Sequence, residues 1–243
     1  EQIGIGTELK INRDYPFSIR QINKEQSGVS ATRNRGLDEA QGDYVIVGTV
    51  LLYFNGDGAV VNVPNGITTV AELVAVFRDV RKVILPETVT TLCKSAFSGR
   101  GNENIQEFVF TDSLVNIGNG AFGMNKWLDS FGDQPVIING QLYRCKATES
   151  TVVVRDGSTK ICAEVFKDNT TIKKVVLPTT LKSIDEQAFA GCQNLQELVL
   201  PEGLEKLGLA CFYRCNKLNK IVFANATIND FEICNNSAKW VKY

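Results

Sequence analysis

The stretch QAFAGCQNLQELVLPEGLEKLGLACFYRCNKLNKIVF, residues 187–223, contains nearly the same pattern twice. A short apolar run leads to a proline, and a phenylalanine follows 11 residues later, as in the step from Pro201 to Phe212. The pattern occurs five times, with the proline position held by Pro86, Thr111, Arg155, Pro178 and Pro201 and the phenylalanine position by Phe97, Phe122, Phe166, Phe189 and Phe212. Equivalent positions in the last three copies are 23 residues apart, so the chain is predicted to stack equivalent structural units.

A copy of this length is too small to bury its own apolar face, so it must share a core with its neighbours. A period of about 20 to 29 residues with one short strand per copy is typical of a leucine-rich-repeat solenoid, an α/β repeat fold. Strand alternation and the turn that follows predict an inward set. It consists of Ile172, Val175, Leu177, Leu181, Ile184, Leu195, Leu198, Leu200, Leu204, Leu207, Leu218, Ile221 and Phe223.

Residues 51–64 and 141–156 interrupt the period in the same way, because each contains a Leu-Tyr pair and then a strand that leads into a repeat. The sequences NGDG at 55–58 and NG at 139–140 are strong signals for tight hairpin turns. We therefore predict two hairpin insertions that protrude from the coil.

Composition and charge exclude several classes of function. The 26 basic and 27 acidic residues give a net charge of -1, which argues against nucleic acid or an anionic membrane surface, because both need a concentrated basic field. No run of about 18 apolar residues occurs, so no membrane insertion is predicted, and residues 1–16 lack the layout of a secretory signal.

Histidine is absent, which removes the commonest general base and the usual nitrogen ligand of zinc. No catalytic residue, metal site or cofactor is predicted.

The seven cysteines form an odd set, so at least one is unpaired within the monomer; they are Cys93, Cys145, Cys162, Cys192, Cys211, Cys215 and Cys234. Cys192 and Cys215 each follow the repeat phenylalanine by three residues, so they occupy the same position in adjacent coils. We interpret them as small buried thiols, with a disulfide and a metal site as the alternatives. Cys145 falls in a predicted hairpin and is expected to be the most exposed thiol.

The segment LVLPEGLEKLGLACFYRCNKL, residues 198–218, resembles the BspA-like leucine-rich repeats of bacteria. Their pattern is an apolar strand, a proline, a leucine, an Ile-Gly step and an Ala-Phe step followed by a cysteine. The resemblance covers residues 50–243, with departures such as Thr111 and Arg155 at the proline position and Cys93 and Cys162 at the glycine position. It implies a cell-surface or secreted protein of a host-associated microbe that binds proteins, since members of the family are linked to adhesion to host matrix.

Residues 1–48 do not repeat and are predicted to form a strand, a helix from Val29 to about Ala40 and a second strand. The segment resembles the middle of family 2 glycosyltransferases at Gly28, Ser30, Arg33, Asn34, Gly36, Gly42 and Tyr44. The carboxylate pair that should follow, to hold a metal and a sugar-nucleotide diphosphate, is replaced by GTVLLYFN, residues 48–55. We therefore predict a small βαβ-like N-terminal cap at 1–48 and a solenoid at 49–243.

The outward face of the predicted strands is the candidate interaction surface. Alternation places charged residues at one outward position and β-branched residues at the other. The ten candidates are Lys82, Ile84, Glu107, Val109, Lys174, Val176, Glu197, Val199, Lys220 and Val222. Opposite charges and β-branched neighbours could serve only to stabilise the sheet, whereas a long apolar strip with charged borders is typical of a protein-binding surface.

The sequence thus predicts a non-enzymatic protein-binding module, an adhesin-like protein at the cell surface or secreted, that recognises host or matrix proteins. Two alternatives stay open. The N-terminal segment could bind a sugar nucleotide, as a glycosyltransferase-related protein would, or the solenoid could be a structural spacer without a partner.

Overall fold

The computed structural model describes residues 44–54, 59–72, 80–98, 101–223 and 239–242. The chain divides into two compact units, residues 1–129 and 130–243. Short strands make up most of the regular structure in the described ranges, and the helices there are the 3-10 turn η1 (Asn102–Asn104) and the single turn α2 (Lys126–Asp129). No helix in these ranges is long and apolar enough to cross a membrane.

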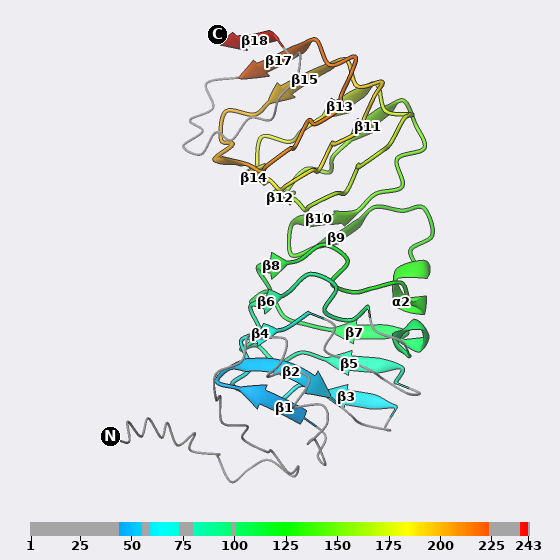
Figure 1. Cartoon of the computed structure of the whole chain (residues 1–243), viewed down its shortest axis with the longest axis vertical. Helices are drawn as coiled ribbons and strands as arrows, with labels where there is room; N and C mark the ends of the chain where they lie inside the picture. Colours follow the sequence, from blue (N-terminus) through cyan, green and yellow to red (C-terminus); the bar gives the residue numbers. More distant parts are fainter. Residues whose placement is uncertain (1–43, 55–58, 73–79, 99–100, 224–238, 243) are drawn as a thin grey trace, which may run out of the picture. The chain divides into compact units, whose positions relative to one another are not determined.

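The first unit contains two sheets, one on each side of the coil (Figure 1). One sheet has the order β1 (Tyr44–Val47), β2 (Val50–Phe54), β4 (Thr69–Val70), β6 (Thr91–Leu92) and β8 (Asn116–Ile117). The other contains β3 (Val60–Asn62), β5 (Lys82–Ile84) and β7 (Glu107–Val109), which pair in parallel. Each coil contributes one strand to each sheet, which is how a solenoid propagates.

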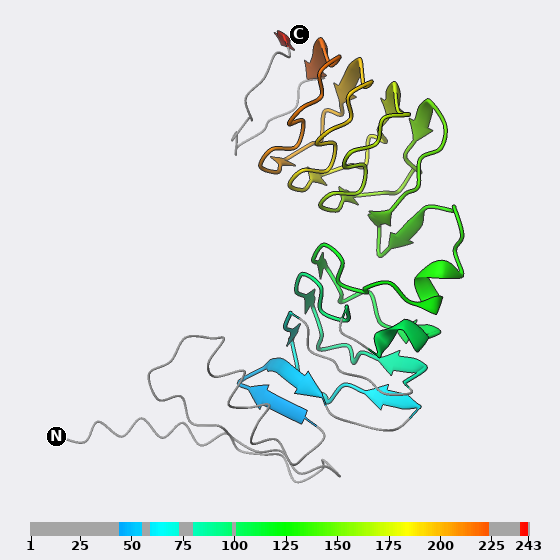
Figure 2. The same cartoon turned by 45° about the vertical axis from the view of Figure 1, so that its right-hand side comes forward.

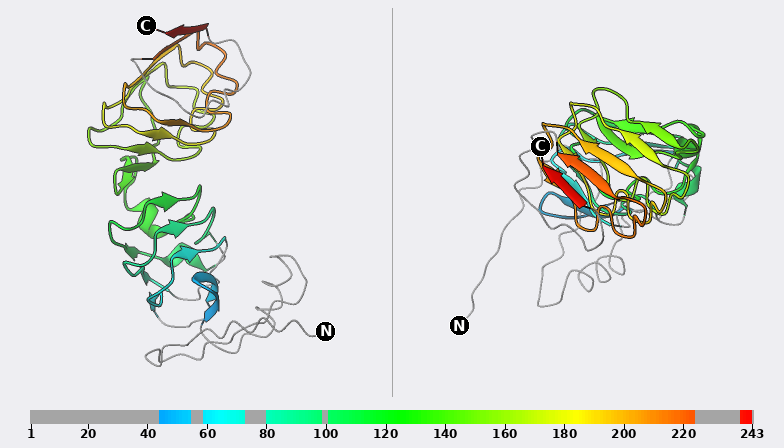
Figure 3. Two further views of the ribbon diagram at one scale, coloured as in Figure 1. Left: turned by 90° about the vertical axis from the view of Figure 1, so that its left-hand side faces the viewer. Right: turned by 90° about the horizontal axis from the view of Figure 1, so that it is seen from above.

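The second unit repeats this plan (Figure 2). One sheet has the order β9 (Val136–Ile138), β10 (Gln141–Arg144), β12 (Lys160–Ile161), β14 (Ser183–Ile184) and β16 (Lys206–Leu207). The other has the order β11 (Thr151–Val153), β13 (Lys174–Val176), β15 (Glu197–Leu200), β17 (Lys220–Phe223) and β18 (Lys239–Lys242). All neighbours in this second sheet are parallel, and Figure 3 shows them side by side.

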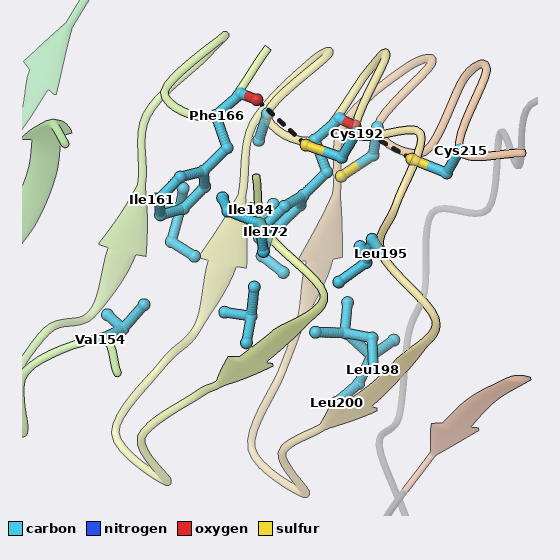
Figure 4. Packing of buried hydrophobic residues seen from close by; sticks show 14 of the residues in the cluster. Val154, Ile161, Phe166, Ile172, Ile184, Cys192, Leu195, Leu198, Leu200 and Cys215 are labelled. Carbon is cyan, nitrogen blue, oxygen red and sulfur yellow. Dashed lines mark hydrogen bonds between the residues drawn. The ribbon is translucent and has the colours of Figure 1, made fainter. Parts of the chain in front are cut away.

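The core of the second unit lies between its two sheets, as strand alternation predicts. Val175 and Leu198 point inward from one sheet and Ile184 from the other, and all are at most 4% exposed. The rings of Phe166 and Phe189 stack at a centroid distance of 5.0 Å, and Figure 4 shows part of this packing. The inward set is confirmed with two exceptions: Leu177 is only partly buried, and the side chain of Phe223 lies outside the described part of the structure.

Of the two predicted hairpins, the one that turns at Asn139 and Gly140 is present, although it does not protrude. The other is wrong, because β2 and β3, the strands on either side of NGDG, lie in different sheets, and the hairpin of the first unit is β1–β2 instead. In β1–β2 and β9–β10 the two strands are antiparallel, and Asn139 and Gly140 join β9 to β10 with positive φ angles of 48° and 74°, as the tightest hairpin turns require. The second strand of each hairpin then pairs in parallel with the next coil, as β2 does with β4 and β10 with β12. Each hairpin is therefore the first layer of its stack, where it supplies hydrogen bonds to the edge that an open stack would expose. The NGDG segment lies outside the described ranges.

The predicted leucine-rich-repeat solenoid is confirmed by these stacked coils. The strand predicted near residues 43–47 is present as β1. The rest of the predicted N-terminal cap falls on residues 1–43, which lie outside the described residues, so the domain boundary at residue 48 stays a prediction.

Candidate interaction surface

The outward face of the β11–β18 sheet carries a row of valines. The strand registers pair Val153 with Val176 and Val199 with Val222, which in turn is opposite Val241. The exposed fractions of three described side chains are large for valine: 69% for Val153, 41% for Val176 and 47% for Val199. We call Val153, Val176, Val199 and Val222 the valine row. Its position follows from the period-2 alternation, because the residues between these valines point into the core.

A row of alternating charges runs beside the valine row. The register places Lys174 opposite Glu197 and Glu197 opposite Lys220. Lys220 Nζ donates a hydrogen bond to Glu197 Oε1 at 3.0 Å, and both side chains are about half exposed, at 41% and 49%. Exposed pairs of this kind contribute about 0 to 1 kcal/mol to stability. Their larger effect is to neutralise the charged border of the valine row.

The β3–β5–β7 sheet of the first unit carries a shorter version of the same pattern. Lys82 is opposite Glu107, with 2.8 Å between Nζ and Oε1. Ile84 is opposite Val109, but the next position of that row, in β3, is held by Asn62. Val109 is 36% exposed and Ile84 is half-buried, so the apolar row here is two residues long.

The structure therefore divides the predicted surface. Lys82, Ile84, Glu107 and Val109 lie on the three-stranded sheet, and the other six candidates lie on the five-stranded one. The two sheets belong to different compact units, and the role of the ten residues as one binding surface stays a prediction. Val153, which sequence reasoning omitted, is the most exposed member of the row; the aligned segment VVVRD, residues 152–156, already placed it two positions before Arg155.

A hollow of about 360 Å³ adjoins one end of the valine row. Val153 and Arg155 line it from β11 and the residues after it, and Phe131, Pro135 and Ile137 line it from the segment that leads into and forms β9. Because the wall is mainly apolar, the hollow suits an aliphatic or aromatic side chain that enters from outside.

The described cysteines form no disulfide, and most are buried. Cys162, Cys192, Cys211 and Cys215 are buried, whereas Cys93 and Cys145 are half-buried. Burial raises the pKa of the half-buried thiols of Cys93 and Cys145. Within the described residues there is no cluster of three histidine, cysteine or carboxylate side chains that could hold a metal ion. Cys145 is thus one of two comparably accessible thiols, and Cys234 lies outside the described ranges.

The class of protein defined by these coils is a leucine-rich-repeat solenoid with parallel sheets and an exposed strand face. The family model for the BspA type leucine rich repeat region matches residues 59–132 and 136–239, in six copies. The match spans most of the chain, so the chain belongs to the BspA type leucine-rich-repeat family. A search of curated proteins found no match.

Solved bacterial structures show the same kind of repeat. A leucine rich cell surface protein from Faecalibacterium prausnitzii is 19% identical over 72% of this chain, with a TM-score of 0.38. A leucine-rich repeat protein from Eubacterium ventriosum is 17% identical over 70% of this chain, also with a TM-score of 0.38. The chain spans 50% of the first protein's length and 61% of the second's. Identities and TM-scores this low say nothing about the function of this chain.

The glycosyltransferase-like residues cannot be assigned a site from the structure. Gly28, Ser30, Arg33, Asn34, Gly36 and Gly42 lie outside the described residues, and of the matching positions only Tyr44 falls in a described strand, β1. The resemblance stays a sequence observation.

Proposed function

We propose that the chain is a non-enzymatic protein-binding module and that the valine row of the five-stranded sheet is its contact surface. The observation that carries this proposal is the exposure of Val153, Val176 and Val199 at equivalent positions of adjacent strands. A contiguous row of exposed apolar side chains is a feature that marks many protein-binding surfaces. A sheet-stabilising role alone would be served equally well by threonine at these positions, because it is also β-branched.

The neighbouring features fit the same role. The ion pair between Lys220 and Glu197 lies beside the row, so a partner would meet an apolar centre with a polar border, the usual anatomy of an interface. The hollow beside Val153 offers a pocket for one anchoring side chain. Family membership supports a cell-surface or secreted location, and a host or matrix protein is the partner that the resemblance implies.

The test is capture of a panel of extracellular matrix proteins, including fibronectin and fibrinogen, on a surface that carries the purified chain. Val199→Lys places a charge in the middle of the row and is expected to abolish saturable capture. Because Val199 is already 47% exposed, the fold should survive, which circular dichroism and thermal melting would check.

Leu209→Lys is the matched control, since Leu209 is 53% exposed and lies in the same unit after β16, outside the valine row. Capture that is lost in Val199→Lys and kept in Leu209→Lys supports the surface. Equal capture by both variants rules out the valine row. Binding of UDP- or GDP-sugars with Mn²⁺ by the unmodified chain, seen as a rise in melting temperature, would instead favour the glycosyltransferase-related alternative.

A further inference from the structure

The first unit contains a second hollow whose character is opposite to that of the apolar one. It measures about 200 Å³, and the described residues that line it are Arg81, Asn104, Gln106 and Lys126. Two cations and two amides therefore face the same space. One water takes up about 30 Å³ of liquid volume, so the hollow has room for an acidic side chain.

The coil geometry brings these residues together from three consecutive turns. Arg81 directly precedes β5 and Gln106 directly precedes β7, and Gln106 N donates to the carbonyl oxygen of Arg81 at 2.7 Å. Asn104 ends η1, and Lys126, the first residue of α2, donates from Nζ to Asn104 Oδ1 at 3.1 Å. The bond to Lys126 orients the Asn104 amide, so its Nδ2 group has two N–H donors to offer, and neither donates to a side chain or backbone group in the described part of the chain.

The charges of this hollow are not neutralised within the described part of the chain. Glu107, next to Gln106, pairs with Lys82 at 2.8 Å. Arg81 and Lys126 form no ion pair with a carboxylate among the described residues. Two unpaired cations that face one hollow attract an anion, and a guanidinium matches the two oxygens of a carboxylate.

The second unit offers an internal comparison. The segment NIQE at 104–107 recurs as NLQE at 194–197, Lys217 Nζ donates to Asn194 Oδ1 at 2.8 Å, and Gln196 N donates to the carbonyl oxygen of Lys173 at 3.1 Å. Two features differ: Lys173 holds the position of Arg81, and Asn194 Nδ2 donates to the carbonyl oxygen of Thr170. The second unit thus has two lysines at these positions, and its asparagine Nδ2 already donates to the backbone.

We propose that Arg81, Asn104, Gln106 and Lys126 form a binding site for the carboxylate of an acidic peptide segment. This inference rests on the protein-binding part of the proposed function and not on the valine row: Arg81 and Gln106 directly precede β5 and β7 in the first unit, where an acidic segment of a protein partner would supply the carboxylate. In the complex, Arg81 donates two parallel hydrogen bonds to the carboxylate oxygens, Lys126 supplies the second positive charge, and the amides of Gln106 and Asn104 donate to the remaining acceptor sites.

The experiment measures the fluorescence anisotropy of a fluorescein-labelled Glu-Gly-Glu-Gly-Glu-Gly-Glu peptide titrated with the full chain at about 50 mM salt, where screening is moderate. Arg81→Ala combined with Lys126→Ala is expected to weaken binding about tenfold. Lys173→Ala combined with Lys217→Ala is the matched control, because it removes the same charge from the equivalent positions of the second unit. We expect the control to change affinity by less than about twofold. Circular dichroism would verify that both variants fold.

Three results would overturn the proposal: no binding of the peptide to the unmodified chain, equal weakening by the two double variants, or binding of a sulfated heparin oligosaccharide through Arg81 and Lys126 without binding of the peptide.

Nitrogen-15 NMR provides a second readout, since the side-chain amide signals of Gln106 and Asn104 should shift when the peptide is added. The Val199→Lys variant separates this site from the valine row, because it should keep peptide affinity unchanged. Peptide binding that depends on Arg81 while no matrix protein is captured would leave this site intact and count against the proposed function alone.

Discussion

The thiol of Cys215 donates a hydrogen bond to the carbonyl oxygen of Phe189, one coil back, with 3.0 Å between Sγ and the oxygen. Cys192 does the same to Phe166, also at 3.0 Å (Figure 4). The repeat cysteine thus fills a small apolar space and uses its weak donor on a carbonyl oxygen of the preceding coil. Both thiols are buried, at 0% and 4% exposure for Cys192 and Cys215, so their contribution is to the structure of the stack.

The first prediction concerns the reactivity of these thiols. Burial raises the pKa of Cys192 to about 12 and that of Cys215 to about 11, and the reactive form of cysteine is the thiolate. At pH 8 we expect Cys162, Cys192 and Cys215 to resist alkylation by iodoacetamide in the folded chain, and Cys93 and Cys145 to be modified first. Peptide mapping by mass spectrometry identifies the sites. Rapid labelling of Cys192 in the absence of denaturant would contradict this account of its burial.

The second prediction is a loss of stability at alkaline pH. Burial also raises the pKa of Cys162, to about 12, from an ordinary value of 9.0. Above pH 9 the unfolded chain therefore releases thiol protons that the folded chain keeps, so the unfolded state binds fewer protons and the free energy of unfolding falls as pH rises. The contribution is fully present below pH 9 and is lost as the pH rises toward 12.

Urea unfolding at several pH values measures this effect. Between pH 9 and pH 10 each of these thiols should contribute a loss of about 1 kcal/mol. Cys192→Ala removes one thiol, so the free energy of unfolding should fall by about 1 kcal/mol less between pH 9 and pH 10. The variant should be less stable than the unmodified chain near neutral pH, and this difference should shrink as the pH rises. An unchanged slope in that variant would show that Cys192 does not titrate between the two states.

Much of the solenoid could be predicted from the sequence because its signal is periodic. The 11-residue step that ends at Phe189 and Phe212 and the shared position of Cys192 and Cys215 both follow from counting along the repeat. Alternation then assigns Leu198 to the core and Val199 to the surface without any further information. Because equivalent positions of successive coils stack into rows, the residues of each row can be predicted by aligning the repeats with one another.

The remaining features depend on contacts that a period does not encode. One such feature is the membership of Val109 and Val153 in two separate sheets, with the β9–β10 hairpin between them along the chain. The hollow lined by Arg81, Asn104, Gln106 and Lys126 depends on the helical turn α2, which begins at Lys126; Lys126 follows Phe122 by four residues, whereas its counterpart Lys217 follows Phe212 by five. Only the recurrence of NIQE and NLQE, residues 104–107 and 194–197, marked this place in the sequence.

The third prediction tests the close contact of neighbouring coils at the repeat glycine. A Cβ added at Gly208 would overlap the backbone of Asp185 and Glu186 in the preceding coil. Gly208→Ala should therefore lower the free energy of unfolding by about 1 to 3 kcal/mol, because backbone atoms must move apart. Gly203→Ala is the control, since the nearest atom to its added Cβ is the end of the flexible Lys182 side chain, at 3.1 Å. Equal stability of the two variants would show that adjacent coils can separate at this point at little cost.

The fourth prediction concerns a strained backbone position two residues before each repeat phenylalanine. This position has a positive φ in every described copy: 54° at Ser95, 64° at Gly120, 61° at Glu164, 51° at Gln187 and 54° at Ala210. The left-handed conformation costs a residue with a Cβ about 1 to 2 kcal/mol, and four of the five copies bear that cost. The conformation is imposed by the turn, because Gln187 N donates to the carbonyl oxygen of Leu209 in the next coil, and Ser95 N to that of Asn119.

Ala210→Gly should consequently raise the free energy of unfolding by about 0.5 kcal/mol, since relief of the left-handed strain exceeds the entropy that glycine gains in the unfolded chain. Ala163→Gly, at a position without a positive φ, should instead lower it by about 1 kcal/mol. The reverse exchange, Gly120→Ala, should cost about 1 to 2 kcal/mol, although the nearest atom to the added Cβ is Ser95 Oγ at 3.5 Å, an ordinary contact. Urea unfolding of the three variants distinguishes backbone strain from packing: if Ala210→Gly and Ala163→Gly destabilise the chain equally, the strain at this turn is not stored in φ.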